Sequence, residues 1–303
     1  MNLKEVIKNP NKIIYTLGMK GKLGFINDEK YLKMMYWANT GKKLNLDNPI
    51  TYNEKLQWLK LHCKKEEYSK MVDKYEAKKW IASKIGSEYV IPLLGVWETF
   101  DDIDFDLLPN QFVLKCTHDS GGLIICKDKI KLDKEAAKKK IENSLKRNYF
   151  LVAREYPYKN VKPRIIAEKY MEDTTCNEEN ENCLTDYKFF CFDGNPKIVY
   201  IGKDHAKHAT TDFFDMDFNH LPIKMRDPNA KTPPNKPIVF EEMKRLATKL
   251  SQGCPHLRVD FYLINGKIYV GELTFFHGGG FTEVKPEEWN YKMGEWINIQ
   301  SER

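Results

Sequence analysis

The stretch Leu257–Phe276, LRVDFYLINGKIYVGELTFF, combines the pattern of a β-hairpin with paired charged residues. Two segments of alternating polar and apolar residues flank Asn265-Gly266, a dipeptide typical of tight hairpin turns. Arg258 and Asp260 lie two residues apart, so they share one face of the first strand, and the apolar residues between and after them take the other face. The stretch therefore predicts a hairpin with one charged and one apolar face.

The turn decides whether Glu272 joins Asp260 on the charged face. A two-residue turn would pair Val259 with Glu272 and place the two carboxylates on opposite faces. A three-residue loop, Ile264–Gly266 with its glycine in the left-handed region, would place Arg258 opposite Glu272 and Asp260 beside it. We predict the second arrangement, because two carboxylates on one face suit Mg²⁺. The alternative is an exposed hairpin with scattered charges.

A second informative stretch lies upstream, at Gln111–Cys126 (QFVLKCTHDSGGLIIC). An apolar strand ends at Lys115, a glycine turn follows, and a second strand returns. Lysine neutralises phosphate charge, and glycine lets backbone N–H groups approach the oxygens, so this pattern suits a phosphate clamp. The alternative is an ordinary hairpin with an exposed lysine. The turn also looks like the nucleophile loop of trypsin-type proteases around Ser120, but too little chain precedes it for the two barrels of such an enzyme.

The middle of the chain predicts further strands. Arg164–Met171 is typical of a strand that reaches a hinge. Asp186–Phe192 and Lys197–Gly202 flank the turn residues Asp193-Gly194 in a hairpin pattern. Within the first of these strands, Asp186 and Lys188 share a face. Three glycines at Gly278–Gly280 follow the last strand and predict a sharp turn or close backbone approach.

Composition narrows the class of protein. The chain has 303 residues, a net charge of +6 and seven cysteines. The basic run Lys129–Arg147 is better explained as a solvated helix face than as a nucleic-acid site. No run of 18 apolar residues predicts a membrane span, and the N-terminus lacks an apolar leader, so we expect a cytoplasmic protein with reduced thiols. The spacings of Cys176, Cys183 and Cys254-Pro-His256 fit no common zinc site.

Several segments in order resemble the ATP-grasp superfamily, and most closely its TupA-like branch of teichuronopeptide and bacterial polysaccharide biosynthesis. The resemblance begins near residue 30. The segments that carry it are GKKLNLDNPITYNEKLQWLKLH at 41–62, MVDKYEAKKWI at 71–81, YVIPLLGVWETFDDIDFDLLPNQFVLKCTHDSGG at 89–122, PRIIAEKYM at 163–171, DYKFFCFDGNPK at 186–197 and RVDFYLINGKIYVGELTFFHGGGF at 258–281.

The resemblance implies that ATP and Mg²⁺ are cofactors. It implies the following roles: Lys74 and Lys115 on the phosphates; His118, Ser120, Gly121 and Gly122 in the glycine loop over them; Glu168, Lys169, Tyr170 and Met171 at the adenine hinge; Asp186 on the ribose; Lys188 on the transferred phosphate; Arg258 on the reaction's oxyanion; Asp260 and Glu272 on magnesium. Thr274 stands where the third metal ligand is usually asparagine. Asp204, His205, His208 and His277 are candidates for contacts with substrate.

The resemblance also implies an activity, a carboxylate–amine ligase that forms an amide through an acyl phosphate. The substrates would be a uronic acid or related acidic sugar and a small amine. The alternatives are a glycosyltransferase, for which Asp215-Met-Asp217 formally fits the metal motif, an ATP-dependent phosphotransferase, and a scaffold that binds ATP without catalysis.

The expected architecture is α+β, with two α+β lobes that enclose ATP. Residues 1–85 are predicted to be mostly helical. Residues 86–165 form a small lobe with a helix near 133–148, and residues 166–303 form a large lobe with a helix near 238–252 and the metal hairpin. The sequence predicts no nucleic-acid partner and leaves the oligomeric state open.

Overall fold

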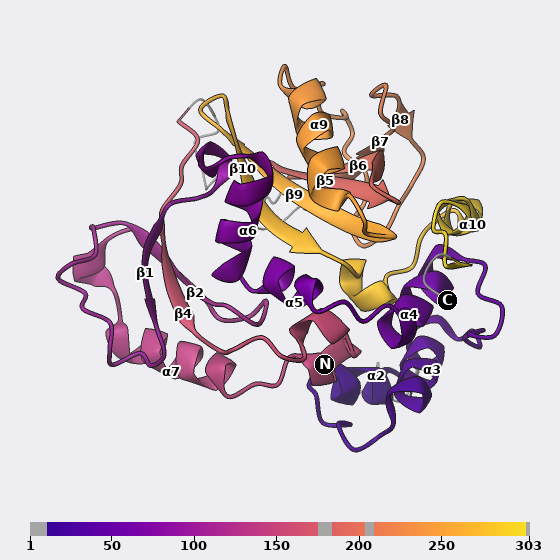
Figure 1. The fold of residues 1–303 in the computed structure, drawn as a ribbon, viewed down its shortest axis with the longest axis horizontal. Helices are drawn as coiled ribbons and strands as arrows, with labels where there is room; N and C mark the ends of the chain where they lie inside the picture. Colours follow the sequence, from indigo (N-terminus) through magenta and orange to yellow (C-terminus); the bar gives the residue numbers. More distant parts are fainter. Residues whose placement is uncertain (1–10, 175–183, 204–208, 301–303) are drawn as a thin grey trace.

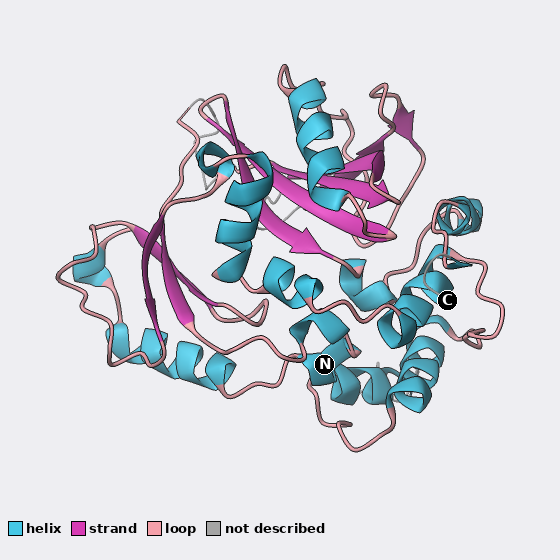
Figure 2. Ribbon diagram, in the orientation of Figure 1, coloured by secondary structure: helices cyan, strands magenta, loops and turns pink. Residues whose placement is uncertain are grey.

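The computed structural model describes residues 11–174, 184–203 and 209–300. Within these ranges the chain forms two antiparallel sheets, one of four strands and one of six, with helices between and around them (Figure 1). Figure 2 shows the helices gathered at the N-terminal part of the chain and on the outer sides of the sheets. The fold is α+β, as predicted. None of the described helices is long and apolar enough to cross a membrane.

The N-terminal part is helical, as predicted. Its elements are α2 (Asn11–Met19), α3 (Asp28–Thr40), α4 (Tyr52–His62), α5 (Glu67–Val72), α6 (Glu76–Ile85) and the 3₁₀ turn η1 (Ser87–Tyr89). Helix α4 begins with a complete capping box, in which Thr51 accepts from the backbone of Glu54 and the Glu54 side chain accepts from the backbone of Thr51. The box fixes the helix start, because it satisfies two backbone donors that the helix leaves open.

The smaller sheet has the strand order β1-β4-β2-β3. Its strands are β1 (Leu93–Trp97), β2 (Phe112–Cys116), β3 (Leu123–Cys126) and β4 (Ile165–Lys169), and the segments between β3 and β4 are η2 (Lys129–Lys131), α7 (Lys134–Leu145), α8 (Phe150–Ala153) and η3 (Tyr156–Tyr158). One face packs on α7 through a core that includes Phe112, Leu114 and Ile141. Because strand residues alternate, Val113 and Lys115 point from the other face.

The larger sheet has the order β10-β9-β5-β6-β7-β8. Its elements are β5 (Asp186–Phe192), β6 (Asn195–Lys203), β7 (Thr210–Phe214), β8 (His220–Leu221), α9 (Phe240–Ser251), β9 (His256–Ile264), β10 (Lys267–Thr274), η4 (His277–Gly280) and α10 (Glu287–Glu295). Strands β5, β6, β9 and β10 and the helix near 238–252 lie where the sequence placed them, whereas β7 and β8 were not predicted. The boundary expected between residues 165 and 166 falls inside β4, which pairs with β1 and β2 of the smaller sheet. The chain therefore leaves that sheet only after Lys169.

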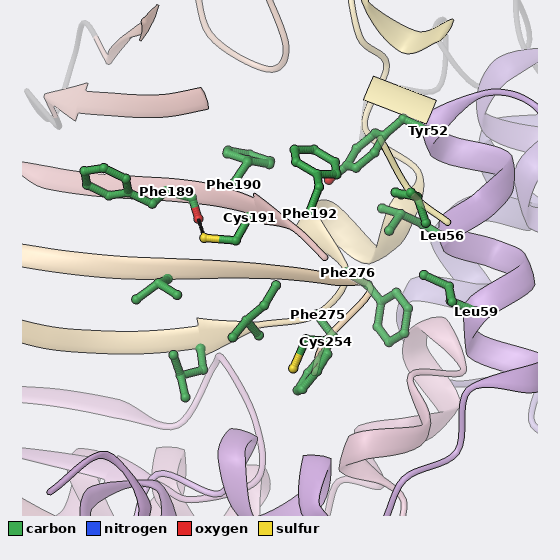
Figure 3. Close-up of a cluster of buried hydrophobic side chains, with 14 of the residues drawn as sticks. Tyr52, Leu56, Leu59, Phe189, Phe190, Cys191, Phe192, Cys254, Phe275 and Phe276 are labelled. Carbon is green, nitrogen blue, oxygen red and sulfur yellow. Dashed lines mark hydrogen bonds between the residues drawn. The ribbon is translucent and has the colours of Figure 1, made fainter. Parts of the chain in front are cut away.

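Both faces of the larger sheet are covered. Phe189 points to α9 and packs on Phe240, with ring centroids 5.6 Å apart. Its neighbours Phe190 and Phe192 point the other way, toward Tyr52 and the rest of α4 (Figure 3). The N-terminal helices and the larger sheet share one core, whereas the smaller sheet has a core of its own with α7.

Candidate active site

The hairpin β9–β10 brings its two carboxylates together, but not by the predicted turn. Ile264 pairs with Lys267, so the turn has two residues, Asn265 and Gly266, with φ of 50° and 76°. The prediction of a three-residue loop was therefore wrong. A bulge between Val270 and Glu272 shifts the register by one residue and sets Glu272 directly opposite Asp260. The bulge, and not the turn, therefore brings Asp260 and Glu272 to the same face of the hairpin.

Gly271 makes this bulge possible. A Cβ at Gly271 would lie 2.6 Å from Cε2 of Tyr262 on the neighbouring strand, which is too close for any side chain. Because of the shift, Arg258 faces Thr274 and not Glu272 as predicted. A lone glycine inside a strand often marks a bulge, and this was the signal that the sequence reading missed.

Asp260 lies at the centre of a buried charged cluster. Arg258 donates two hydrogen bonds to its carboxylate, each 2.7 Å long. Lys188, on β5, lies 3.2 Å from Asp260 and 2.8 Å from Asp186. Burial opposes ionisation of Asp260, but Arg258 and Lys188 outweigh it and hold its pKa below the usual value. Burial raises the pKa of Asp186, with a further contribution from Asp260.

Arg258 is fixed by two more residues. Its Nη1 donates to Nδ1 of His277 at 2.6 Å, and its Nη2 donates to the hydroxyl of Thr274 at 3.0 Å. Burial lowers the pKa of His277, and the charge of Arg258 lowers it further, so this ring stays neutral and can accept. His277 and Thr274, expected at the substrate and the metal, orient Arg258 in this structure.

The oxygen donors near the bulge fit Mg²⁺. Asp260 and Glu272 face one another, and the Glu272 carboxylate has no hydrogen bond or ion pair with any residue in the described ranges. Asp186 Oδ1 is buried and accepts no hydrogen bond there. No group of three or more His, Cys, Asp or Glu suited to a metal occurs among the described residues. Magnesium commonly takes one or two carboxylates and completes its shell with water and phosphate, so this donor set is sufficient.

The smaller sheet carries a second charged cluster, in which positive charge is in excess. Glu168 on β4 lies 2.6 Å from Lys115 and 2.5 Å from Lys78 of α6. Burial opposes ionisation of Glu168, but the two lysines outweigh it and lower its pKa. The side chain of Glu168, expected at the adenine hinge, is thus engaged by the lysines. Sequence reasoning missed Lys78, although it lies four residues after Lys74, about one helical turn away.

The glycine loop is tied to its surroundings at several points. Lys74 Nζ donates to the carbonyl of Asp119, and the Asp119 carboxylate accepts from the backbone of Gly122 at 3.1 Å. The His118 ring is buried and its Nε2 lies 3.2 Å and 3.1 Å from carbonyl oxygens at the end of α7. The His118 ring therefore faces α7, and only the backbone of His118 is available to bind a phosphate. Ser120 Oγ bonds to the Tyr149 hydroxyl at 3.0 Å.

One cleft brings the lysine cluster of the smaller sheet together with the bulge of β10. It is lined by Lys74, Lys78, Lys115 and Glu168 on one side and by Gly271 and Glu272 on the other. Next to it lies a mostly apolar pocket of about 150 Å³. That pocket is lined by Val113, Leu123 and Ile125 of the smaller sheet, by Glu168, Lys169, Tyr170 and Met171, and by Tyr262.

The remaining candidates lie elsewhere. Asp204, His205 and His208, like Cys176 and Cys183, fall outside the described residues. Asp215 of the DMD triplet accepts from the backbone of Asp217 and Asn219, and so stabilises a turn. His256 is buried in the core, where its Nδ1 donates to the carbonyl of Phe275 at 2.7 Å. The described cysteines are buried free thiols.

Two sheets that contribute to a common cleft, with lysines on one wall and the Glu272 carboxylate on the other, are the arrangement expected of an ATP-grasp protein. A family model described as TupA-like ATPgrasp matches residues 54–298, so the chain belongs to this family and has the ATP-grasp fold.

The chain is also similar to solved structures of ligases. The D-alanine–D-alanine ligase from Bacillus anthracis complexed with ATP is 14% identical over 77% of this chain and 64% of its own, with a TM-score of 0.44. The ATP-grasp ligase PsnB with minimal precursor, Mg and ADP is 10% identical over 82% of this chain and 66% of its own, with a TM-score of 0.41. The chain thus spans slightly less than two thirds of the first of these proteins. A search of curated proteins finds no match.

Proposed function

We propose that the chain is an ATP-dependent carboxylate–amine ligase. The observation that carries this proposal is the shared cleft, in which Lys74 and Lys115 line one wall and Glu272 the other. Such a cleft suits a magnesium-bound triphosphate, because the lysines attract the phosphate oxygens and the carboxylates attract the metal. Family membership supports the same reading.

The apolar pocket would hold the adenine. Val113, Ile125 and Tyr262 offer it apolar and aromatic surface, and Lys169, Tyr170 and Met171 offer backbone groups at the hinge. Asp186, whose Oδ1 is buried without a partner among the described residues, would accept a hydrogen bond from a ribose hydroxyl. With these assignments, ATP would run from its phosphates in the cleft to its adenine in the apolar pocket beside the smaller sheet.

The reaction would proceed in two steps. The substrate carboxylate attacks the γ-phosphate of ATP, which forms an acyl phosphate and releases ADP, while Lys74, Lys115 and Lys188 neutralise the phosphate charge. Magnesium bound by Asp260 and Glu272, with Thr274 beside them, would add its positive charge at the phosphates. The neutral amine then attacks the carbonyl carbon of the acyl phosphate, and Arg258 stabilises the oxyanion. Phosphate leaves with the electron pair of the broken C–O bond and takes up the proton that the nitrogen releases.

The glycine loop would shield the acyl phosphate from water. Its anchors at Lys74 and Tyr149 are single hydrogen bonds, which permit the loop tip to move. The proposed acceptor is a uronic acid or a related acidic sugar of a capsular or cell-wall polysaccharide, and the proposed place of action is the cytoplasm. These last proposals are supported by the family resemblance.

A mass-spectrometric screen tests the activity. Uronic acids are paired with amino acids and amino alcohols in the presence of ATP and Mg²⁺, and the expected result is a condensation product together with ADP and free phosphate. The Glu272→Gln variant is the control, because Glu272 has no partner in the described structure and its loss should not disturb folding. No condensation with any pair by folded, ATP-binding enzyme would contradict the ligase proposal. A phosphorylated product would instead indicate a phosphotransferase, and sugar transfer without ADP a glycosyltransferase.

A further inference from the structure

A set of polar residues takes no chemical step in the mechanism above, although one of them, Tyr149, anchors the glycine loop. It comprises the buried Lys60 on α4, and the half-buried Tyr149 and the buried Glu155 and Tyr158 on the segment 149–158. The segment packs against the glycine turn η4, since a Cβ at Gly279 would lie only 3.0 Å from the Cβ of Ala153. It therefore connects the smaller sheet to the end of the metal hairpin.

Glu155 is a buried carboxylate without a partner. It is 8% exposed, and its carboxylate makes no hydrogen bond or ion pair with any residue in the parts of the chain that the structure describes. Buried carboxylates are normally paired, because an uncompensated charge in the interior is costly. Burial raises the pKa of Glu155; Lys60 opposes this rise, and the charge of Glu272 adds to it. Glu155 thus lies within electrostatic reach of the metal hairpin.

Lys60 does not neutralise Glu155 directly. Its Nζ donates to Gln57 Oε1 at 2.8 Å and to the carbonyl of Gly279 at 2.5 Å, and it lies 4.5 Å from the ring centre of Phe281. These contacts use the ammonium group to hold α4 to the glycine turn. Glu155 is left without a close cation of its own.

Two tyrosines connect the segment that carries Glu155 to the glycine loop. The Tyr149 hydroxyl bonds to Ser120 of the glycine loop, and its ring packs edge-on against Tyr158, with centroids 4.8 Å apart. Burial raises the pKa of both phenols, and the charges of Glu155 and Glu272 raise it further. The tyrosines therefore stay neutral, and Tyr149 joins the segment of Glu155 to the glycine loop.

The backbone at Glu155 is held firmly by its neighbour. Arg154 is 1% exposed, and its Nη2 donates to the carbonyls of Leu23 and Ile26 at 3.2 Å each. Its guanidinium also lies 4.1 Å from the ring centre of Tyr31. A rigid backbone supports a binding role, because a fixed carboxylate loses little entropy when a ligand binds.

We propose that Glu155 binds the ammonium group of the amine substrate, with Tyr149 and Tyr158 as the aromatic walls of the site. Carboxylate and aromatic rings are the chemistry that recognises a cation. The inference rests on the proposed ligase function and deepens it, since it assigns the amine to a side of the cleft. It also predicts a substrate class, namely primary amines that bind as ammonium ions and pass one proton to the Glu155 carboxylate before the nitrogen attacks.

Calorimetric titration with ethanolamine in the presence of ADP and Mg²⁺ tests the site. We expect saturable binding to the wild type, about tenfold or more weaker binding to Glu155→Gln, which loses one charge-assisted contact, and no change in the exposed control Glu288→Gln. Ethylene glycol, which has the same size without the charge, should not compete. Equal binding by Glu155→Gln, or competition by ethylene glycol, would overturn the inference.

If the Glu155 variant does not fold, titrations of the wild-type protein still test the proposal. Wild-type protein that binds ATP but shows no saturable binding of ethanolamine would contradict the amine site and leave the ligase proposal standing. Wild-type protein that does not bind ATP would contradict the proposed function itself. The ethanolamine and ATP titrations therefore separate the two failures.

Discussion

Two buried carboxylates, one on each sheet, each lie beside two cations, but the charge around them differs in sign. Glu168 on the smaller sheet lies between Lys115 and Lys78, so positive charge is in excess. Asp260 on the larger sheet also has two cations, Arg258 and Lys188, but Asp186 lies within the same cluster and Glu272 directly opposite. The same device, a carboxylate held ionised by two cations, thus produces one wall that attracts anions and one that attracts cations.

The difference shows how a fold can prepare a site for a metal–phosphate pair. A buried ion pair contributes little to net stability, because desolvation offsets the attraction. Asp260 and the four charged side chains near it are therefore better explained by ligand binding than by folding. The smaller sheet needs only to present lysines, so its cleft face is otherwise apolar, with Val113 and Ile125 beside Lys115.

The largest expected effect comes from Arg258. Replacement by lysine keeps the charge but loses the fork that bonds to Asp260, His277 and the oxyanion, so kcat should fall by about 10²–10³. Steady-state release of ADP with a productive substrate pair measures it, and the exposed Arg245→Lys on α9 is the matched control. A fall of less than tenfold would show that the larger sheet does not stabilise the transition state through this residue.

The second largest effect is expected from low pH, which should destabilise the larger sheet. Burial lowers the pKa of His256 to about 4, and it lowers the pKa of His277 as well, so both are neutral when folded. Below pH 6.5, the ordinary pKa of histidine, the unfolded chain binds protons that the folded chain does not. The free energy of unfolding therefore falls as the pH drops from 6.5 toward 4. His256 alone accounts for about 3 kcal/mol.

Urea unfolding between pH 4 and 7 measures this effect. A His256→Gln variant keeps hydrogen bonding to Phe275 but cannot take up the proton, so its stability should fall less steeply with pH. A slope equal to that of the wild type would rule out His256 as the source.

The lysines of the smaller sheet should differ from one another. Lys115→Met removes a charge that faces the cleft and should weaken ATP binding by about 10–100-fold, the equivalent of one hydrogen bond to a charged group. Lys78→Met should have a smaller effect, because Lys78 acts on the site through Glu168 and also donates to the carbonyl of Ile91 at 2.8 Å. Calorimetry with ATP compares the two variants. A larger loss for Lys78→Met would reverse their assigned roles.

The smallest effect is expected at Thr274. Asparagine at this position could still accept from Arg258, as the Thr274 hydroxyl does at 3.0 Å, so turnover should stay within about fivefold, or 1 kcal/mol. The magnesium concentration for half-maximal activity should fall, because an amide oxygen is a suitable metal ligand. An unchanged magnesium dependence would separate Thr274 from the metal.

Much of the fold could be predicted from alternation in the strands. The residues of β5 and β9 divide correctly into a face under α9 and a face with Asp186, Lys188 and Asp260, because period two is visible in the sequence. The register of β10 could not be predicted in the same way, because a bulge at Gly271 changes the pairing without changing the pattern. Local sequence fixes the faces, while the packing of Tyr262 over Gly271 fixes the register.

Long-range partners were the part that the sequence did not reveal. Lys60 is an ordinary lysine in a helix until the glycine turn at 277–280 folds back on α4 and buries it. Glu155 follows the buried Arg154 in a short connection and carries no periodic signal. The resemblance named Lys115 and Glu272 individually, but their meeting in one cleft depends on how α6 packs against β10 and the smaller sheet.

Binding of ATP with and without Mg²⁺, compared between wild type and Glu272→Gln, tests the central claim most directly. The two opposed walls predict that Mg²⁺ tightens ATP binding in the wild type, and that Glu272→Gln loses this gain while its metal-free binding through the lysines is unchanged. Equal tightening by Mg²⁺ in both proteins, or no binding of ATP by the wild type, would contradict the account.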